Sequence, residues 1–424
     1  MKPKLLTTLK TYSWPLFGAD VFAGVTVAMV ALPLSLAIAI ASGAEPAAGL
    51  ITAIVAGFLI SLLGGSRVQI GGPTGAFIVV VYGVIAHHGF DGLVLATLMA
   101  GVILLIAGFF KAGNLIQFIP EAVVNGFTMG IAVIIATSQL KDLFGLEIEN
   151  LPADFLHKLP ALWAGRETLN FAALGIGLAT IALIVLLRRL APKWPGLIVA
   201  VGLTSAAVVV FALPVETIAS RFGALPSHLP TPALPDMSLA RMQELLPSAL
   251  VIAFLAGVES LLSAMVADRM IKGTHRPNAE LIAQGAANIG SSLFGGLPAT
   301  GAIARTATNV NAGGKTPVAG IVHSLVILLM MLFAGQLVGE LALPALAGLL
   351  MLTAWNMSEP HKWRDYAKMR MEDRVLLVVT LVLTVVADLT TAIGVGVGVG
   401  VGLGLAIRLR RRDVPPADWD APER

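Results

Sequence analysis

Two ionisable residues, Arg305 and Glu259, lie inside apolar stretches where a charge is costly. Arg305 follows the run Gly-Gly-Leu-Pro-Ala-Thr-Gly-Ala-Ile-Ala at 295–304, which is rich in residues that break helices. Within a bilayer, irregular backbone is tolerated only where it lines a cavity or is buried in protein. A charge at mid-membrane costs at least about 2.5 kcal/mol, so it marks an ion pathway or an internal pair. This combination predicts a transporter site for an anion.

Glu259 lies in the predicted span 244–267, close to Ser260 and Ser263. A buried carboxyl group can hold a proton or coordinate a cation, which predicts a site for a coupling ion. The alternative is that Glu259 only pairs with Arg305. Both interpretations can hold together, because a cation and an anion that enter together offset each other's charge.

The composition is that of a membrane protein. Of the 424 residues 57% are hydrophobic and 12% are charged, with a mean hydropathy of +0.87, whereas soluble domains carry about 25% charged residues. At ~20 residues per span, the apolar segments predict about fourteen transmembrane crossings. The predicted spans are 18–42, 46–64, 70–87, 90–110, 118–140, 168–187, 195–213, 244–267, 278–294, 300–312, 316–338, 341–356, 373–388 and 391–408.

The placement of charge agrees with this layout. Apart from Arg305, only five of the 28 Lys and Arg residues fall on the outer side if the N-terminus is inside: Lys141, Lys158, Arg166, Arg221 and Arg241. This asymmetry follows the positive-inside rule. We therefore expect an integral protein of a bacterial inner membrane with both termini in the cytoplasm. The net charge of +3 is too small to indicate nucleic-acid binding, and the absence of cysteine excludes disulfides and thiolate metal sites.

An internal repeat is visible in the sequence. Residues 50–65 and 281–296 share seven identical residues without a gap, and Pro73-Thr74-Gly75 corresponds to the Pro-Ala-Thr-Gly run at 298–301. The alternative is chance similarity between helices rich in small residues. Two halves with an odd number of spans have opposite topology, and inverted repeats with matching broken helices are typical of secondary transporters. The predicted organisation is a first repeat at 1–213, an external linker at 214–243, a second repeat at 244–408 and a cytoplasmic tail at 409–424.

The third span of each half begins with Gly, Pro and Thr before it becomes continuously apolar. Pro is favoured at the first helical position, and Thr can cap the N–H groups of the first turn. We therefore expect half-helices that begin near mid-membrane at Pro73/Thr74 and at Thr300/Gly301, with their N-termini facing each other. Each N-terminus offers free N–H donors and about half a positive charge, so an anion fits between them.

Several motifs together resemble the sulfate permease family, also called solute carrier family 26. They are Gly18-Ala19-Asp20, Ala31-Leu32-Pro33-Leu34, Gly72-Pro73-Thr74-Gly75, Glu259-Ser260-Leu261-Leu262, Glu280 to Gly285, Gly301 to Asn309, Ala312 to Pro317 and Ala354 to Glu359. The resemblance implies an all-α fold with fourteen spans in a seven-plus-seven inverted repeat of the uracil-permease type. It also implies a core domain (spans 1–4 and 8–11) that moves against a gate domain (spans 5–7 and 12–14), and a homodimer.

The resemblance places the anion site between the half-helices of spans 3 and 10. The residues it assigns there are Thr74, Gly75, Thr300, Gly301, Ala304 and Arg305, with Leu34 and Ile38 from span 1. In a branch that transports sodium with bicarbonate, the cation site maps to Glu259, Ser263, Gly301 and Ile303. That branch has Asp at the position of Glu259 and Thr at the position of Ile303. Because both residues differ here, this sequence favours H⁺ over Na⁺ as the coupling ion.

The sequence thus predicts a secondary active transporter of sulfate, bicarbonate or a C4-dicarboxylate, coupled to H⁺ or Na⁺. The coupling ion is the only cofactor expected, and Na⁺ at Glu259 is the only metal. The alternatives are an uncoupled anion channel or an anion exchanger that uses the same site. No nucleophile–base set or catalytic spacing indicates an enzyme. The family usually has a STAS domain after the last span, and none is expected in this sequence.

Two further residues have structural interpretations: His323 as a packed core histidine and Asp20 as a solvated or capping residue.

Overall fold

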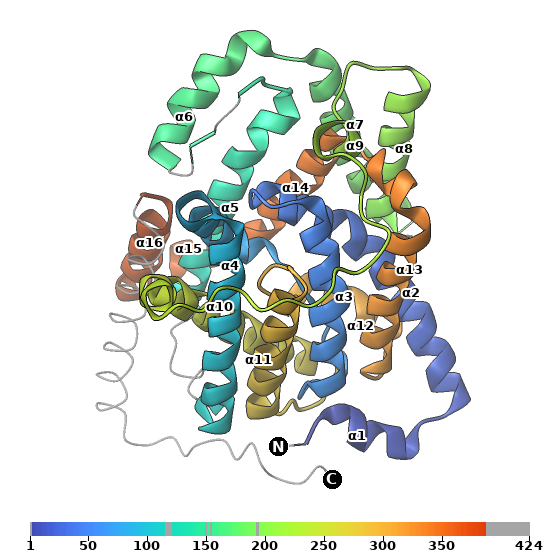
Figure 1. Cartoon of the computed structure of the whole chain (residues 1–424), viewed down its shortest axis with the longest axis vertical. Helices are drawn as coiled ribbons and strands as arrows, with labels where there is room; N and C mark the ends of the chain where they lie inside the picture. Colours follow the sequence, from blue (N-terminus) through green and yellow to red (C-terminus); the bar gives the residue numbers. More distant parts are fainter. Residues whose placement is uncertain (1, 115–120, 149–150, 153–154, 192–194, 387–424) are drawn as a thin grey trace.

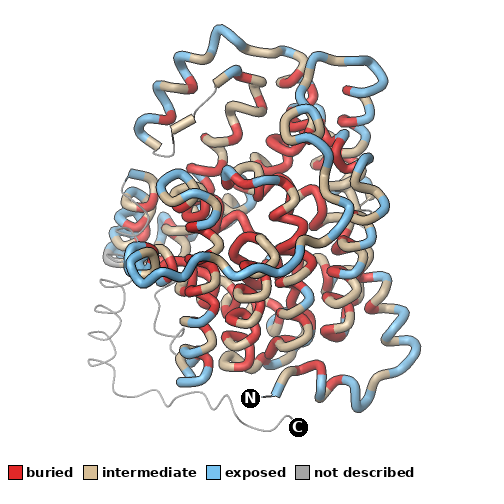
Figure 2. The backbone as a smooth tube through the Cα atoms, in the orientation of Figure 1, coloured by how far each residue is buried: buried red, intermediate tan, exposed pale blue. Residues whose placement is uncertain are grey.

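The structure is a computed structural model, which describes residues 2–114, 121–148, 151–152, 155–191 and 195–386. These parts of the chain are mostly helical, and the helices pack side by side in a single bundle (Figure 1). Buried residues concentrate in the middle of the bundle, and exposed residues occupy its ends and periphery (Figure 2).

The order of elements follows the predicted order of spans, with a helix at every predicted span before residue 391. The first half contains α1 (Lys4–Thr8), η1 (Leu9–Thr11), α2 (Trp14–Ala41), α3 (Pro46–Leu63), β1 (Gly71–Gly72), η2 (Gly75–Phe77), α4 (Ile78–Phe109), α5 (Glu121–Phe144), α6 (Phe155–Ala164), η4 (Gly165–Thr168), α7 (Phe171–Leu190) and α8 (Gly196–Val210). The second half contains α9 (Ile218–Phe222), α10 (Leu239–Ile271), α11 (Pro277–Leu293), β2 (Thr300–Gly301), α12 (Ile303–Asn311), α13 (Val318–Gly339), α14 (Leu343–Met357), η5 (Pro360–Lys362), α15 (Trp363–Lys368) and α16 (Met371–Val386).

Within the described ranges, seven helices are long and apolar enough to cross a membrane. They are α2, α3, η2 with α4, α5, α7, α10 and α13. Helices α8, α11, α12, α14 and α16 are shorter than the ~20 residues that a full crossing needs. The count of fourteen spans therefore stays a prediction, and its last span at 391–408 and the tail at 409–424 lie outside the described residues.

Helix boundaries follow the distribution of proline and glycine. Helices α3 and α11 begin at Pro46 and Pro277, where the missing N–H of proline loses no helical hydrogen bond. Helix α3 ends before Gly64-Gly65. Within α4, Gly89 has φ 72° and ψ 178°, values that only glycine adopts readily. This break separates residues 78–88 from 90–109, close to the boundary predicted between the third and fourth spans.

The helices form two groups that mix the halves of the sequence. In the first group, α11 packs on α3 and α4, α10 packs on α4, and α13 packs on α2 and α3. In the second group, α5 packs on α14 and α16, and α7 packs on α8 and α14. The two halves of the chain therefore do not form separate bodies. Each group instead takes helices from both halves.

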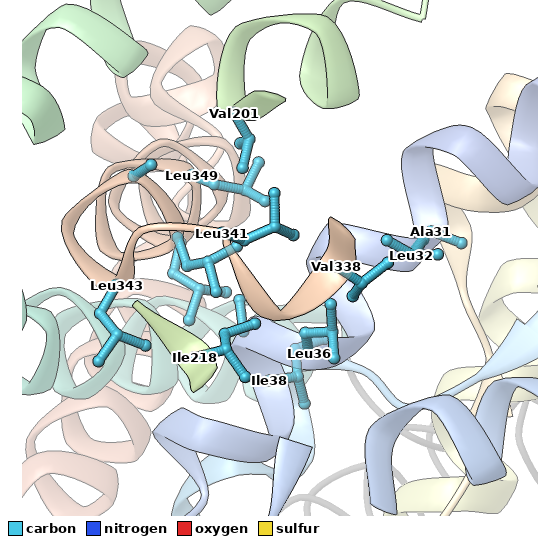
Figure 3. Packing of buried hydrophobic residues seen from close by; sticks show 14 of the residues in the cluster. Ala31, Leu32, Leu36, Ile38, Val201, Ile218, Val338, Leu341, Leu343 and Leu349 are labelled. Carbon is cyan, nitrogen blue, oxygen red and sulfur yellow. The ribbon is translucent and has the colours of Figure 1, made fainter. Parts of the chain in front are cut away.

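The two groups meet across a hydrophobic cluster. Figure 3 shows Leu36 and Ile38 of α2 and Val338 of α13 in one cluster with Leu349 of α14, which belongs to the second group. The cluster also includes residues of α5, α7 and α8. Contacts between the groups are thus mainly apolar, whereas hydrogen bonds between distant residues are concentrated within the first group.

The segment 214–243 was expected to be an extended linker. It contains the short helix α9, and Thr217 forms an isolated antiparallel bridge with Ala342. After α9 the chain crosses one face of the bundle without regular structure before α10 begins (Figure 1). Ala233 N–H donates to Leu293 O at 2.8 Å, which fixes this crossing segment to the end of α11.

Of the two roles predicted for Asp20, solvated or capping, the solvated one is wrong, because its side chain is fully buried. Its Oδ1 accepts from the N–H groups of Lys315 at 2.8 Å and Thr316 at 3.1 Å, and its Oδ2 accepts from Thr316 Oγ1 and Tyr12 Oη. Burial raises the pKa of Tyr12 to about 12, and the charge of Asp20 adds to this shift, so the phenol stays protonated as a donor. Asp20 thus fastens α2 to the segment that leads into α13.

Replacing Asp20 by alanine should destabilise the protein, because several buried donors lose their partner at about 1–3 kcal/mol each. We expect a clear fall in the midpoint of thermal unfolding in detergent. Asp91→Ala removes an exposed carboxylate and should leave the midpoint unchanged. An equal midpoint for both variants would show that the buried contacts of Asp20 contribute nothing.

Candidate functional site

The site is organised by a two-residue antiparallel pairing between β1 and β2. Gly71 pairs with Gly301 and Gly72 pairs with Thr300. Ala302 N–H also donates to Ile70 O at 2.8 Å, which extends the pairing by one bond. The broken segments of the two sequence halves thus satisfy each other's backbone groups, as non-helical backbone inside an apolar bundle requires.

Glycine is needed here because other side chains occupy the space beside the strands. A Cβ on Gly301 would lie 1.5 Å from Gln69 Nε2, and a Cβ on Gly72 would lie 2.3 Å from Arg305 Nη1. Gly72 also has φ 151°, which residues with a side chain rarely adopt. The glycines therefore let the strands approach polar side chains closely.

A helix begins directly after each strand, as the sequence predicted. Thr74 precedes η2, which continues into α4, and Ala302 precedes α12. Because β1 and β2 lie side by side, the two helix N-termini are close together, and their first-turn N–H groups can act on the same anion. Ile303 is 40% exposed and Ala304 is also exposed, so the first turn of α12 is accessible.

The prediction that the threonines cap these helices is wrong. Neither Thr74 nor Ala302, the two N-cap residues, makes a side-chain capping bond. Thr74 Oγ1 donates instead to Glu259 Oε2 at 2.9 Å, and Thr300 Oγ1 donates to Ala256 O at 2.8 Å. Both hydroxyls bind α10, because that helix lies alongside and offers acceptors. The N–H groups at the helix starts are therefore left for another acceptor.

Arg305 lies beneath the strand pair and is 1% exposed. Its Nη2 donates to Pro73 O at 2.9 Å and to Ser35 Oγ at 3.1 Å. Its Nε and Nη1 have no hydrogen-bond partner among the described residues. Buried polar groups are almost always bonded. Two free donors on a buried cation are thus consistent with an anion as the partner.

Glu259 interacts electrostatically with Arg305, but no ion pair joins their side chains in the described structure. The hydrogen bond that its side chain accepts from Thr74 connects it to the start of the α4 half-helix. Ser263 lies one turn further along α10 and is 3.4 Å from Thr306 Oγ1. The carboxylate and hydroxyls of α10 thus lie behind both half-helices, where a hard cation or a proton finds oxygen ligands.

The predicted sites are therefore partly brought together. Thr300 and Gly301 form β2 itself. Thr74, Gly75 and Arg305 lie beside the strand pair, and Ile303 and Ala304 form the accessible turn that follows β2. The structure places Ile38 in the hydrophobic cluster at 2% exposure, whereas Leu34 is half-buried beside that cluster. Between them in the sequence, Ser35 is the α2 residue that contacts Arg305.

Sequence reasoning missed the polar residues that hold the strand pair from behind. Gln69 donates to Ser260 O and Oγ at 3.0 Å, and Ser260 donates to the buried Glu280. Glu280 also accepts from the N–H groups of Gly65 and Ser66. Glu280 and Gln69 could have been noticed in the sequence, because they are polar residues in apolar segments. The sequence did not indicate which groups they contact.

The site borders the second group of helices. A Cβ on Gly75 would lie 3.2 Å from Met357 Sδ and 3.3 Å from Ile135 Cδ1. Met357 ends α14 and Ile135 belongs to α5, so two apolar side chains of the second group lie against the start of the α4 half-helix. The site is therefore located where the two groups meet.

Comparison with known proteins gives a consistent result. The sequence profile of the sulfate permease family matches residues 17–380. YvdB of Bacillus subtilis, which is named as a sulfate transporter, is 43% identical over 381 residues that cover 90% of this chain and 72% of YvdB. The bicarbonate transporter BicA of Picosynechococcus is 32% identical over 392 residues that cover 88% of this chain and 68% of BicA.

Solved structures agree with these sequence matches. The transmembrane domain of a cyanobacterial bicarbonate transporter, BicA, superposes with a TM-score of 0.81 at 30% identity and covers 90% of this chain and 98% of that domain. Murine solute carrier 26 family member A9 in its inward-facing state gives a TM-score of 0.84 at 19% identity, over 97% of this chain and 72% of that one. The second comparison shows a shared fold.

Gly301→Ala should disrupt the site, because the new methyl group displaces Gln69 and breaks its bonds to Ser260. We expect a lower thermal midpoint and at least a tenfold loss of anion affinity, since two buried hydrogen bonds contribute about 1 kcal/mol each. Gly83→Ala is the matched control, because a Cβ there meets nothing within 4 Å in α4. It should keep affinity and raise stability slightly. Wild-type behaviour of Gly301→Ala would mean that the close approach of Gln69 is not required.

Proposed function

This chain belongs to the sulfate permease family, and from that membership we propose that it is a secondary active transporter of small anions coupled to H⁺ or Na⁺. It is an integral membrane protein whose relatives are transporters and not enzymes. The substrates proposed are sulfate, bicarbonate or a C4-dicarboxylate. The protein is proposed to act as a homodimer in a bacterial inner membrane.

The observation that carries this proposal is the convergence of three positive groups at one place. Two helix N-termini meet at the β1–β2 pair, and Arg305 lies beside them with no hydrogen-bond partner for Nε and Nη1 among the described residues. Partial charges at the helix ends favour an anion by about 0.3–1 kcal/mol each, and the buried guanidinium adds a full charge. A tetrahedral or planar oxyanion can accept from all three groups, which fits the proposed substrate class.

Glu259 supplies the proposed coupling to a cation. A bound anion leaves the site with an excess of negative charge if Glu259 is ionised, and this excess favours a proton or Na⁺ at the carboxylate. Thr74 joins the two ligand positions, because its hydroxyl bonds to Glu259 while its residue begins the anion-binding half-helix. Binding of each ion therefore favours binding of the other, which is the thermodynamic requirement for symport.

The arrangement of the helices supports alternating access by movement of the first group against the second. Both ligand positions belong to the first group, so they can move as one unit. The contact surface is mainly apolar, as at Gly75 against Met357 and Ile135. Such a surface can slide without leaving buried hydrogen-bonding groups unpaired.

The function is tested by uptake of labelled sulfate, bicarbonate and succinate into liposomes that contain the full chain. An inward proton or sodium gradient is imposed while the voltage is held at zero with valinomycin and equal potassium. We expect at least one of the anions to accumulate above its equilibrium level under one of the gradients. Entry that never exceeds equilibrium under either gradient would assign the protein to the channel or exchanger class.

Arg305→Gln should weaken anion binding by about 10- to 100-fold, because charge-assisted hydrogen bonds contribute about 1.5–3 kcal/mol. Arg305→Lys retains the charge and should lose less affinity, since it lacks only the planar set of donors. Binding is measured by isothermal titration in detergent. The control Arg269→Gln removes an exposed arginine at the end of α10 and should bind as the wild type does. Unchanged affinity in Arg305→Gln would remove this residue from the mechanism.

Glu259→Gln should separate binding from coupling. The amide keeps the shape of the side chain and can still bond to Thr74, so anion affinity should change by less than about threefold. Accumulation driven by the cation gradient should be lost, because the neutral amide offers no site for a charge-balancing cation. The comparison of titration with gradient-driven liposome uptake checks this prediction, and full accumulation by the variant would contradict it.

A further inference from the structure

His323 is a fully buried side chain in α13 with an unusual property. Neither Nδ1 nor Nε2 of its ring has a hydrogen-bond partner among the described residues. Its neighbour Ser324, by contrast, donates to Ala53 O at 3.2 Å. The expected packed core histidine is therefore packed, but its two polar atoms are not bonded to the protein. Because buried polar atoms nearly always have partners, this ring is placed to bind something other than the protein.

The position of the ring connects it to the anion site. The point where a Cβ on Gly57 would lie is 3.7 Å from His323 Cε1 and 3.1 Å from Gly71 O. The imidazole is thus beside β1 at Gly71. Arg305 contacts the next residue of the same strand, since its Nη1 would touch a Cβ on Gly72. The two side chains lie near consecutive residues of one strand, and both have nitrogen atoms without a hydrogen-bond partner in the part of the chain that the structure describes.

Arg305 is also the charged group that acts on His323. The elements packed on α13 are α2, α3 and α9, and α3 contains no titratable residue. Asp20 of α2 is held by Tyr12, Lys315 and Thr316. Arg221 of α9 is paired with Asp142 and Glu216. This leaves Arg305 of α12, whose charge acts on the ring in addition to the effect of burial.

On the basis of the proposed anion transport, we propose that His323 is a proton-binding site coupled to the anion site through Arg305. The charge of the guanidinium opposes a second positive charge on the nearby ring. An anion that binds Nε and Nη1 of Arg305 offsets that charge and so removes the part of the opposition that comes from Arg305, whereas the part that comes from burial stays. Anion binding therefore raises the affinity of His323 for a proton. By linkage, a proton on His323 must strengthen anion binding by the same factor. This site is separate from Glu259, which lies on α10 and bonds to Thr74.

The test measures sulfate affinity of the full chain against pH between 5 and 8, by titration in detergent. Because Glu259 can also take up a proton, the decisive comparison uses Glu259→Gln as the background. In that background we expect sulfate binding to tighten toward low pH, by up to about tenfold per unit for one linked proton. Adding His323→Gln should flatten the profile. The matched control is His228→Gln, an exposed residue after α9, which should leave the profile as it was.

Each outcome decides the proposal. A flat profile already in Glu259→Gln, or an unchanged slope after His323→Gln is added, would overturn the role of His323 and leave anion transport standing. A wild type that binds none of sulfate, bicarbonate and succinate would overturn both proposals. If His323→Gln does not fold, as judged by its thermal midpoint, His323→Phe tests the same point, because it fills the space with an apolar ring that cannot bind a proton. A sloping profile in that variant counts equally against the proposal.

Discussion

Backbone polar groups in the middle of an apolar bundle must find partners within the protein, and the pairing of β1 with β2 meets this requirement. The backbone N–H and C=O groups of each strand are hydrogen-bonded by the other strand, so each broken segment depends on the other. The pairing joins segments from opposite halves of the sequence. It also decides where α4 and α12 can begin, which places two helix N-termini next to each other. The close approach is possible because Gly72 and Gly301 leave room for Arg305 and Gln69.

Charge is the second constraint on the site. Arg305 is almost completely buried, and carbonyl and hydroxyl oxygens satisfy only its Nη2. Glu259 lies nearby but bonds to Thr74 instead of forming an ion pair with the arginine. A site that holds a buried cation and a separate buried carboxyl group favours ligands that bring both signs of charge. His323 is a third buried titratable group, and the charge of Arg305 acts on it.

The distribution of polar and apolar contacts suits a protein whose parts move. Hydrogen bonds that connect distant residues, such as Gln69 to Ser260 and Asn309 to Val68, lie within the first group of helices. The boundary with the second group is made mainly of aliphatic side chains, including Leu36 of α2 and Leu349 of α14 (Figure 3). Rigid polar bonding within one group and apolar contact between groups allow the site to move as a unit. The same division lets a site with many hydrogen bonds border an apolar surface, which the proposed movement requires.

The sequence by itself determined the features that depend on local composition. Helix breakers at 71–75 and 295–301 predicted where the helices stop and restart, and the cost of a charge in lipid singled out Arg305 and Glu259. The tertiary structure alone decided which groups these residues contact. Thr74 and Thr300 were expected to cap their own helices but bond to α10, and Ser35, Gln69 and His323 owe their places at the site to segments far away in the chain. Local patterns report the preferences of a backbone segment, whereas a buried polar side chain bonds to whichever acceptor the packing of distant helices brings within reach.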